Sequence, residues 1–414
     1  MSILVAPRGV PASATHPTNA DLTSALPGAP AATAAPALRI GRLDLDVPVV
    51  LAPMAGITNT AFRRLCREYG AGLYVSEMIT SRALVERTPE SMRLIRHHDS
   101  ETTRSIQLYG VDPKTVSEAV TMLVAENRAD HIDLNFGCPV PKVTRKGGGA
   151  ALPWKIDLFR EIVEGAVDAA GDLPLTIKMR KGIDADHLTF LEAGRIAEGA
   201  GVASIALHAR TAAEFYSGTA DWPAIETLKN AITTVPVLGN GDIWSADDAV
   251  RMMRETGADG VVVGRGCLGR PWLFGDLHAA FTGSTVSGKI EPALGFVATA
   301  FRRHAELLTE FFDGDEDRAC RDIRKHVAWY FKGYAVGGDL RASLATVQSL
   351  AMMDDLLGEL DWAQPYPGAD AEGQRGRAGS PKSPSLPYGW LDSRELRETD
   401  RAEVSAAELH HSGG

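Results

Sequence analysis

Cysteine is scarce in this sequence, and its spacing offers neither a metal site nor a redox pair. The four cysteines are widely separated, and no two have the spacing of metal ligands or of a redox pair; they are Cys66, Cys138, Cys267 and Cys320. We therefore expect reduced thiols, no metal site and a cytoplasmic location.

Long apolar runs and an excess of basic residues are also lacking. No stretch reaches the roughly 18 apolar residues that cross a bilayer, and residues 1–20 lack the order of a secretory signal. The net charge of −10 argues mildly against a nucleic-acid partner unless basic residues are gathered locally. We expect a monomer without membrane contact.

Both ends of the chain have few large apolar side chains. Residues 1–38 are rich in Ala, Pro, Thr and Ser, and residues 364–414 are rich in Pro, Gly, Ser and charged residues. Such segments bury too little apolar surface to offset the entropy of ordering. The sequence predicts a disordered leader at 1–38 and a mostly disordered tail at 364–414.

Between these ends, short apolar runs alternate with amphipathic stretches of helical period. This pattern is typical of parallel strands buried on both faces, and eight such units in about 250 residues favour a TIM (β/α)8 barrel over 39–285. A doubly wound sheet is the competing architecture. The predicted strands are Val49–Met54, Leu73–Met78, Ser105–Gly110, His131–Phe136, Leu175–Met179, Ser204–His208, Val235–Asn240 and Gly260–Gly264.

The barrel is favoured because polar residues stand at or just beyond the ends of these strands, where barrel enzymes assemble their active sites. Core packing prefers apolar groups, so a whole set of polar residues at corresponding positions indicates a site. The set comprises Glu77, Gln107, Asn135, Cys138, Lys178, Arg180, His208, Asn240, Asp242 and Arg265.

The last two strands are followed by glycine-containing loops, Asn240-Gly241-Asp242 and Gly264-Arg265-Gly266. Small residues there let backbone N–H groups approach an anion, and barrels often bind phosphate at these two loops. The alternative is that the glycines only form tight turns. A phosphate beside a pocket without metal ligands suggests a phosphorylated cofactor, with FMN as the first candidate.

Lys178 and Gln107 suit a flavin, because a cation favours the reduced ring and an amide can both donate and accept at its edge. An ion pair between Lys178 and Glu77 is the alternative. Cys138 lies in a loop between Gly137 and Pro139, where a thiol of pKa about 8.5 can deliver a proton. A buried apolar role is the alternative for this cysteine.

Several long motifs resemble those of the tRNA-dihydrouridine synthases, in the family's order from about Leu51 to Trp272. They are LAPMAGITNTAFRRLC, SIQLYG, HIDLNFGCPVPKVTRKGGGAAL, TIKMRKGID, LHARTAAEFYSGTADW, VLGNGDI and GVVVGRGCLGRPWLF. These motifs resemble most those of the bacterial B-type branch of the family.

The resemblance implies reduction of the uracil C5–C6 double bond in tRNA by FMN, with NADPH as the reductant. Flavin N5 would pass hydride to C6, and Cys138 would protonate C5 of a base extruded from its stack. Asn135 and Arg180 would face the uracil. The implied cofactor residues are Pro53, Met54, Ala55, Gln107, Lys178, His208, Asn240, Gly241, Asp242, Gly264 and Arg265.

Residues 292–360 are expected to form a small helical domain, which in the resembled family helps to hold tRNA. Arg321, Arg324 and Lys325 are predicted to share one helix face, with His326, Trp329, Tyr330 and Tyr334 interleaved. The alternative is a solvated charged face. Two rival functions remain: an FMN-dependent dehydrogenase of a free pyrimidine, of the dihydroorotate type, and a tRNA-binding protein without catalysis.

Overall fold

Eight parallel strands form a closed barrel in the order β10-β3-β4-β5-β6-β7-β8-β9. The computed structural model describes residues 37–70, 72–283, 289–376, 378–397, 400, 401 and 404. The predicted barrel is confirmed, and the doubly wound alternative is wrong. The strands are β3 (Val49–Leu51), β4 (Leu73–Thr80), β5 (Ser105–Tyr109), β6 (His131–Phe136), β7 (Leu175–Arg180), β8 (Ser204–His208), β9 (Val237–Asn240) and β10 (Gly260–Val263).

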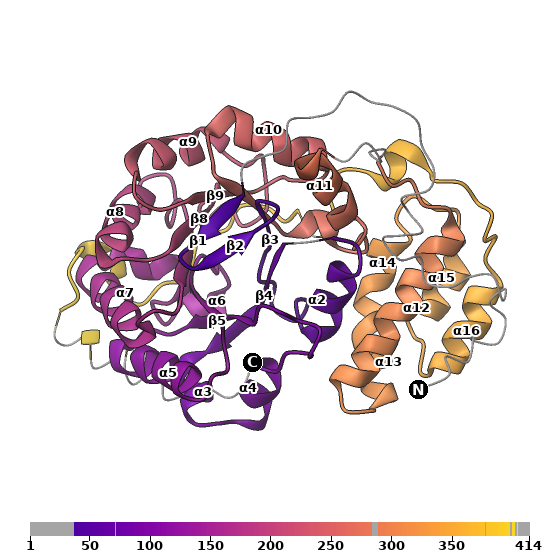
Figure 1. The fold of residues 1–414 in the computed structure, drawn as a ribbon, viewed down its shortest axis with the longest axis horizontal. Coiled ribbons are helices and arrows are strands. Elements are labelled where there is room, and N and C mark those ends of the chain that lie inside the picture. Colours follow the sequence, from indigo (N-terminus) through magenta and orange to yellow (C-terminus); the bar gives the residue numbers. More distant parts are fainter. Residues whose placement is uncertain are drawn as a thin grey trace.

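Helices cover the outside of the barrel (Figure 1). Some of them begin at side-chain caps: the Asn59 side chain accepts from Phe62 N, and Ser245 and Asp248 form a capping box. The barrel helices are α2 (Thr60–Arg67), α3 (Ser81–Val85), α4 (Pro89–Leu94), α5 (Pro113–Ala125), α6 (Pro141–Thr144), α7 (Ile156–Ala170), α8 (Phe190–Ala200), α9 (Trp222–Ala231), α10 (Ala246–Thr256) and α11 (Leu273–Thr282), with 3-10 turns η1 (Gly149–Trp154) and η2 (Arg265–Cys267).

A short antiparallel hairpin, β1 (Leu38–Ile40) and β2 (Leu43–Leu45), closes the amino-terminal end of the barrel. The side chains of Leu38, Ile40 and Leu45 pack on inward-facing residues of the barrel strands. This end is therefore filled with apolar groups, and the carboxyl-terminal end is left for polar ones. The leader predicted at 1–38 lies outside the described residues up to residue 36, whereas its last residue, Leu38, is a buried strand residue.

A second group of helices lies beside the barrel, next to α2 (Figure 1). This helical lobe (residues 294–358) is the predicted small helical domain. It packs through α12, where the His304 ring lies 5.4 Å from that of Phe62 and Arg64 pairs with Glu310 at 2.5 Å. No helix in the described part of the chain is long and apolar enough to span a membrane. Its elements are α12 (Leu294–Phe311), α13 (Glu316–Ile323), η3 (Arg324–His326), α14 (Val327–Tyr330), α15 (Gly338–Leu344) and α16 (Leu350–Gly358).

The chain after the helical lobe differs from the predicted disordered tail. Residues 364–376 and 378–397, here called the C-terminal strap, return to the barrel and pack on it. Trp390 is 3% exposed and Arg375 is 4% exposed, although regular structure in the described part is limited to η4 (Gly368–Ala371) and η5 (Trp390–Asp392). Average composition misled the prediction, because a few large side chains anchor an otherwise polar segment.

Candidate active site

The polar residues predicted at the strand ends meet at the carboxyl-terminal rim of the barrel. Strand register places Asn135 beside Lys178, Arg180 beside His208, and His208 beside Asn240. Neighbouring parallel strands end at the same rim, so a separation of tens of residues in sequence becomes one strand spacing in space.

A cavity of about 90 Å³ opens between the ends of β3, β7, β8, β9 and β10. Gln107 does not line it and is fully buried within the barrel, and Ala55 lines a neighbouring, larger cavity. The other predicted cofactor residues all line the smaller cavity: Pro53, Met54, Lys178, His208, Asn240, Gly241, Asp242, Gly264 and Arg265.

The loop after β9 is held in a conformation that requires glycine. Gly241 has φ of 128°, and a Cβ there would lie 2.7 Å from Ala220 Cβ. The next residue, Asp242, has φ of 54° and accepts hydrogen bonds from Arg210 Nη2 at 2.8 Å and from Ala220 N at 2.7 Å. Asp242 thus fixes the loop while Arg210 offsets its charge.

Arg265 in the cavity lining, and Arg210 as the ion-pair partner of Asp242, place positive charge near this end of the cavity and make it suitable for an anion. Arg265 lies 3.6 Å from Asp242, with its guanidinium over the rings of Tyr216 and Trp244. Arg210 is 1% exposed, and its Nη1 has no hydrogen-bond partner among the described residues. A buried donor without a partner costs about 1–3 kcal/mol. The donor set therefore fits the phosphate of a cofactor.

Lys178 and His208 face the same cavity with their charged forms disfavoured. Burial, reinforced by Arg180, lowers the pKa of Lys178 to about 8, although Asp133 acts in the opposite direction. Burial and the charges of Arg180 and Lys178 hold the pKa of His208 well below its usual value. The imidazole is therefore neutral at neutral pH, whereas most of the Lys178 amine remains charged. An electron-rich ligand would relieve the repulsion among these cations.

The alternative ion pair between Lys178 and Glu77 does not form. Glu77 instead accepts a hydrogen bond from Gly56 N at 2.6 Å, and no ion pair joins it to Lys178 in the described structure. Burial raises the pKa of Glu77, while Gly56 N–H and Lys325 lower it. Glu77 thus shapes the loop after β3 and leaves Lys178 to the cavity.

A chain of buried hydrogen bonds runs through the barrel to the Cys138 loop. Gln107 Nε2 donates to Asp133 at 2.6 Å, and Asn135 Nδ2 donates to Gln107 Oε1 at 2.9 Å. Asn135 Oδ1 then accepts from Gly137 N and Cys138 N, at 3.1 and 2.9 Å. On the other side, Asp133 accepts from Thr176 Oγ1 at 2.6 Å. This network fixes the orientations of the Gln107 and Asn135 amides.

Asp133, Thr176 and His131 belong to this network and were missed as site residues. His131 Nε2 lies 2.9 Å from Thr176 Oγ1, and burial raises the pKa of Asp133 to about 6. The signal was present: His131, Asp133 and Asn135 alternate along β6, and alternate residues of a strand share one face. Polar residues at period two inside an apolar strand indicate a polar barrel interior.

Cys138 lies just beyond β6, half-buried, on the loop that Asn135 holds. Burial raises the pKa of the Cys138 thiol, against the lowering effects of the Val140 backbone and of Arg180 and Lys178. The group is therefore a protonated thiol at neutral pH, as a proton donor must be. Cys66, Cys267 and Cys320 are buried in the core.

Arg180 makes several hydrogen bonds within the protein that the sequence did not predict. Its Nε donates to Gly137 O at 2.8 Å, and its Nη1 donates to Thr211 O and Phe215 O at 2.8 and 2.7 Å. The guanidinium lies 5.3 Å from the ring centre of Tyr216, a residue that the sequence interpretation did not single out. Arg180 thus joins the Cys138 loop to the loop after β8, in addition to any contact with a substrate.

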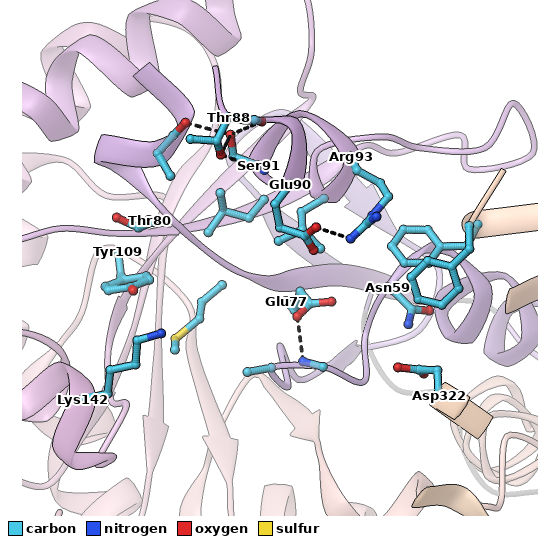
Figure 2. Close-up of a pocket in the computed structure, with 18 of the residues that line it drawn as sticks. Asn59, Glu77, Thr80, Thr88, Glu90, Ser91, Arg93, Tyr109, Lys142 and Asp322 are labelled. Atoms are coloured by element: carbon cyan, nitrogen blue, oxygen red, sulfur yellow. Dashed lines mark hydrogen bonds and ion pairs between the residues drawn. The ribbon is translucent and has the colours of Figure 1, made fainter. Parts of the chain in front are cut away.

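A larger cavity of about 570 Å³ lies between the barrel and the helical lobe. Figure 2 shows Tyr109 and Lys142 on one side of it, Asp322 of the lobe on the opposite side, and Glu77 between them. Ala55, Arg318 and Arg321 also line it. Because Ala55 directly follows Pro53 and Met54 of the smaller cavity, the two cavities adjoin at the loop after β3.

The three basic residues predicted to share one helix face do not do so. Helix α13 ends at Ile323, and η3 tightens the next turn. Arg321 is exposed and lines the larger cavity, whereas Arg324 donates twice to Val347 O, at 2.9 and 2.7 Å. Lys325 reaches across to Gly56 O at 2.5 Å and to Asp322 at 2.8 Å. Two of the three therefore hold the lobe together or join it to the barrel.

The aromatic residues expected among these cations mostly belong to the core. His326 and Tyr330 are each 1% exposed, and Tyr334 is buried. The His326 ring packs against His304 and Trp329. Only Trp329, half-buried, keeps part of its surface free among these four. The predicted interleaved surface of cations and aromatic rings is therefore not formed.

A family model described as dihydrouridine synthase (Dus) matches residues 50–361, which include the barrel strands and the helical lobe. This chain belongs to the dihydrouridine synthase family. The resemblance found in the motifs is thereby confirmed.

Three bacterial proteins are among the relatives of this dihydrouridine synthase family member. A probable tRNA-dihydrouridine synthase of Mycobacterium tuberculosis is 56% identical over 379 residues, covering 89% of this chain and 96% of the relative. One of Mycobacterium leprae is 51% identical, covering 88% of this chain and all of the relative. The tRNA-dihydrouridine synthase B of Vibrio vulnificus is 35% identical, covering 77% of this chain and 97% of the relative.

Proposed function

We propose that this protein reduces the C5–C6 double bond of uridines in tRNA to dihydrouridine. FMN, when bound with its phosphate end in the smaller cavity, supplies the hydride that is added to uracil C6. Cys138 supplies the proton to C5, and its thiolate recovers a proton from solvent. NADPH is the reductant, so one NADPH is oxidised for each uridine reduced. We further propose that the protein is a monomer and acts in the cytoplasm.

The observation that carries the proposal is the placement of a protonated thiol beside a cationic cavity. Cys138 comes from β6 and Lys178 from the adjacent β7, where Asn135 is level with Lys178. Reduction of an electron-poor double bond needs a hydride at one carbon and a proton at the other. A cation that favours electron-rich flavin and a thiol on the neighbouring strand meet both needs.

The chain's own residues position the reaction. Arg265, Arg210 and the backbone of Gly241 and Gly264 would hold the cofactor phosphate, with Asp242 fixing the loop. Lys178 and neutral His208 would lie at the ring, and the buried Gln107 supports Asn135 from below. We infer that Asn135 and Arg180 border the uracil. The 570 Å³ cavity would admit the extruded nucleotide.

The rival functions differ in their substrate and in whether turnover occurs. The large cavity that the helical lobe lines favours a polymer over a free pyrimidine, because a free base needs no such opening. A binding protein without catalysis has no use for the converging Cys138, Lys178 and His208.

One experiment tests the proposal and separates it from both rivals. Protein loaded with FMN is reduced anaerobically with NADPH and then mixed with unmodified tRNA, with uracil or with orotate. We expect flavin reoxidation and dihydrouridine formation with tRNA alone. Reoxidation by a free pyrimidine would support the dihydroorotate-type rival. If tRNA binds without reoxidation, the non-catalytic alternative holds. Release of FAD, or failure to retain FMN, would contradict the cofactor assignment.

A further inference from the structure

The C-terminal strap touches three of the loops that carry the proposed site. A Cβ on Gly376 would lie 3.5 Å from Arg265 Cδ, in the loop after β10. Lys382 N donates to Ala213 O at 2.9 Å, in the loop after β8. Trp390 packs on Gly147, in the loop after β6. Figure 1 shows this segment, in yellow, leaving the helical lobe and passing behind the barrel.

Trp390 is the strongest of these anchors. Its ring is 3% exposed, and its Nε1 donates to Ala151 O at 3.0 Å. A Cβ added to Gly147 would lie 2.5 Å from the ring, and Gly147 has φ of 78°, so only glycine suits this contact. Lys155 lies with Nζ 5.1 Å from the ring centre and donates to Ser393 O at 2.7 Å.

The segment under Trp390 is also the one on which Cys138 rests. Ala150 N donates to Cys138 O at 3.0 Å. A Cβ on Gly149 would lie 2.4 Å from Cys138 O and 3.1 Å from Cys138 Cβ. Residues 147–151 are therefore a thin layer of backbone, with the Cys138 loop on one side and the Trp390 indole on the other.

The strap is a poor candidate for simple core filling. Its residues 378–383 are exposed, and Tyr388 is 101% exposed although it stands two residues before the buried Trp390. Its anchors fall on loops of the proposed site. The match to the family model ends at residue 361, so the strap lies outside the residues that this model matches.

We propose that Trp390 is a positioning residue for the reduction of tRNA. By pressing on Gly147 and holding Ala151, it fixes the 147–151 layer and thereby the Cys138 thiol against the base. This inference rests on the proposed role of Cys138 as the acid. Loss of the indole frees the layer and misplaces the donor, while the cofactor cavity on the far side of β7 is untouched.

The test uses full-length, FMN-loaded Trp390→Ala, with Tyr388→Ala as a matched control on the same strap. We expect tRNA-driven reoxidation of Trp390→Ala to slow about 10- to 100-fold, the range that a displacement near 1 Å produces. The KM for tRNA and the rate of reduction by NADPH should stay near wild type. Without tRNA, alkylation of Cys138 by iodoacetamide, followed by peptide mass spectrometry, should accelerate. Tyr388→Ala should match wild type in all four.

The variants Trp390→Phe and Trp390→Leu test whether the loss of activity comes only from a loss of stability. Trp390→Phe keeps an aromatic ring and should retain most of the activity. Trp390→Leu should lose activity even if its thermal midpoint equals that of Trp390→Phe. Should Trp390→Ala fail to fold, the comparison of Phe with Leu decides. Wild-type turnover and alkylation in Trp390→Leu would overturn the proposal, as would equal losses in Tyr388→Ala.

Cys138→Ala, measured in parallel, separates the two levels of inference. If Cys138→Ala is inactive and the Trp390 variants are normal, only the role of the strap is lost. If Cys138→Ala reoxidises on tRNA at the wild-type rate, Cys138 is not the acid, and the role of Trp390 in positioning it fails as well.

Discussion

The basic residues of the barrel rim and those of the helical lobe differ in burial and in the partners that they contact. At the rim, Lys178 and Arg265 are largely buried and line one cavity, and the buried Arg210 pairs with Asp242 of the same lining. In the lobe, Arg321 pairs with Asp317 on the surface, and Arg324 and Lys325 are occupied by backbone carbonyls.

The difference shows where charge can serve binding and where it serves folding. Cations that remain buried together without enough anions raise the free energy of the empty site, so an anionic ligand stabilises it. A surface cation with a carboxylate one turn away is nearly balanced already and contributes at most about 1 kcal/mol. Rim substitutions should therefore have large effects on the cofactor and on catalysis, and lobe substitutions should have small effects on tRNA affinity.

The largest effect is expected at Cys138. In Cys138→Ala, reoxidation of reduced flavin by tRNA should slow by at least the 10²–10⁴-fold of general acid catalysis, about 3 kcal/mol or more. FMN binding and reduction by NADPH should persist, because neither needs this proton. Stopped-flow measurement of the two half-reactions tests this, with Cys320→Ala as the control for loss of a thiol. If reoxidation is unchanged, another group near the flavin is the general acid, with His208 as the first candidate.

Arg210→Leu should have the next largest effect, on cofactor binding and stability together. It removes the orphaned Nη1 donor and leaves the Asp242 carboxylate without the Nη2 group that donates to both of its oxygens. Breaking a buried pair costs about 3–5 kcal/mol, and FMN affinity should fall at least tenfold. Fluorescence titration of apo-protein and urea unfolding measure the two, with the exposed Arg254→Leu as control. FMN affinity within a factor of two of wild type would remove Arg210 from the phosphate site.

A pH effect of intermediate size is expected from Lys178. Its pKa is lowered from 10.5 to about 8, so the amine is charged below pH 8 and loses its charge as pH rises through that value. A cation favours reduced flavin. Reduction by NADPH should therefore slow, roughly tenfold for about 1.4 kcal/mol lost, between pH 7 and pH 9.5. Lys178→Arg should flatten this profile, and a profile unchanged in Lys178→Arg would assign the titration to another group.

The smallest effect distinguishes Arg321 from Arg324 in the helical lobe. Arg321→Ala should weaken tRNA binding slightly and reduce the slope of log affinity against log salt by about 0.7–0.9, one phosphate contact. Arg324→Ala should leave that slope intact and cost about 1.5–3 kcal/mol of stability, because Val347 O loses both of its donors. Filter binding across a salt titration and urea unfolding decide between them. A reduced salt slope in Arg324→Ala at unchanged stability would restore the face predicted from sequence.

The sequence by itself determined the barrel, the family and most of the residues that line the smaller cavity. Buried parallel strands must be nearly continuous apolar runs, and polar residues at their ends must then meet at one rim, so sequence order translates directly into position. Lys178, His208, Asn240 and Arg265 were predicted on this ground and line one cavity. Polar residues also alternate with apolar ones inside the strands. Interpreting them as an inward-facing layer would have identified Asp133 and Thr176.

Only the tertiary structure decided the contacts between elements that no local pattern links. Helix spacing placed Arg321, Arg324 and Lys325 on one face, but the turn tightens after Ile323, and carbonyls of Val347 and Gly56 take up two of the three. Trp390 looked like part of a polar tail because its partner, Gly147, lies far upstream in the sequence. A contact of that kind depends on the shape of two distant surfaces, and composition averaged along the chain does not contain it.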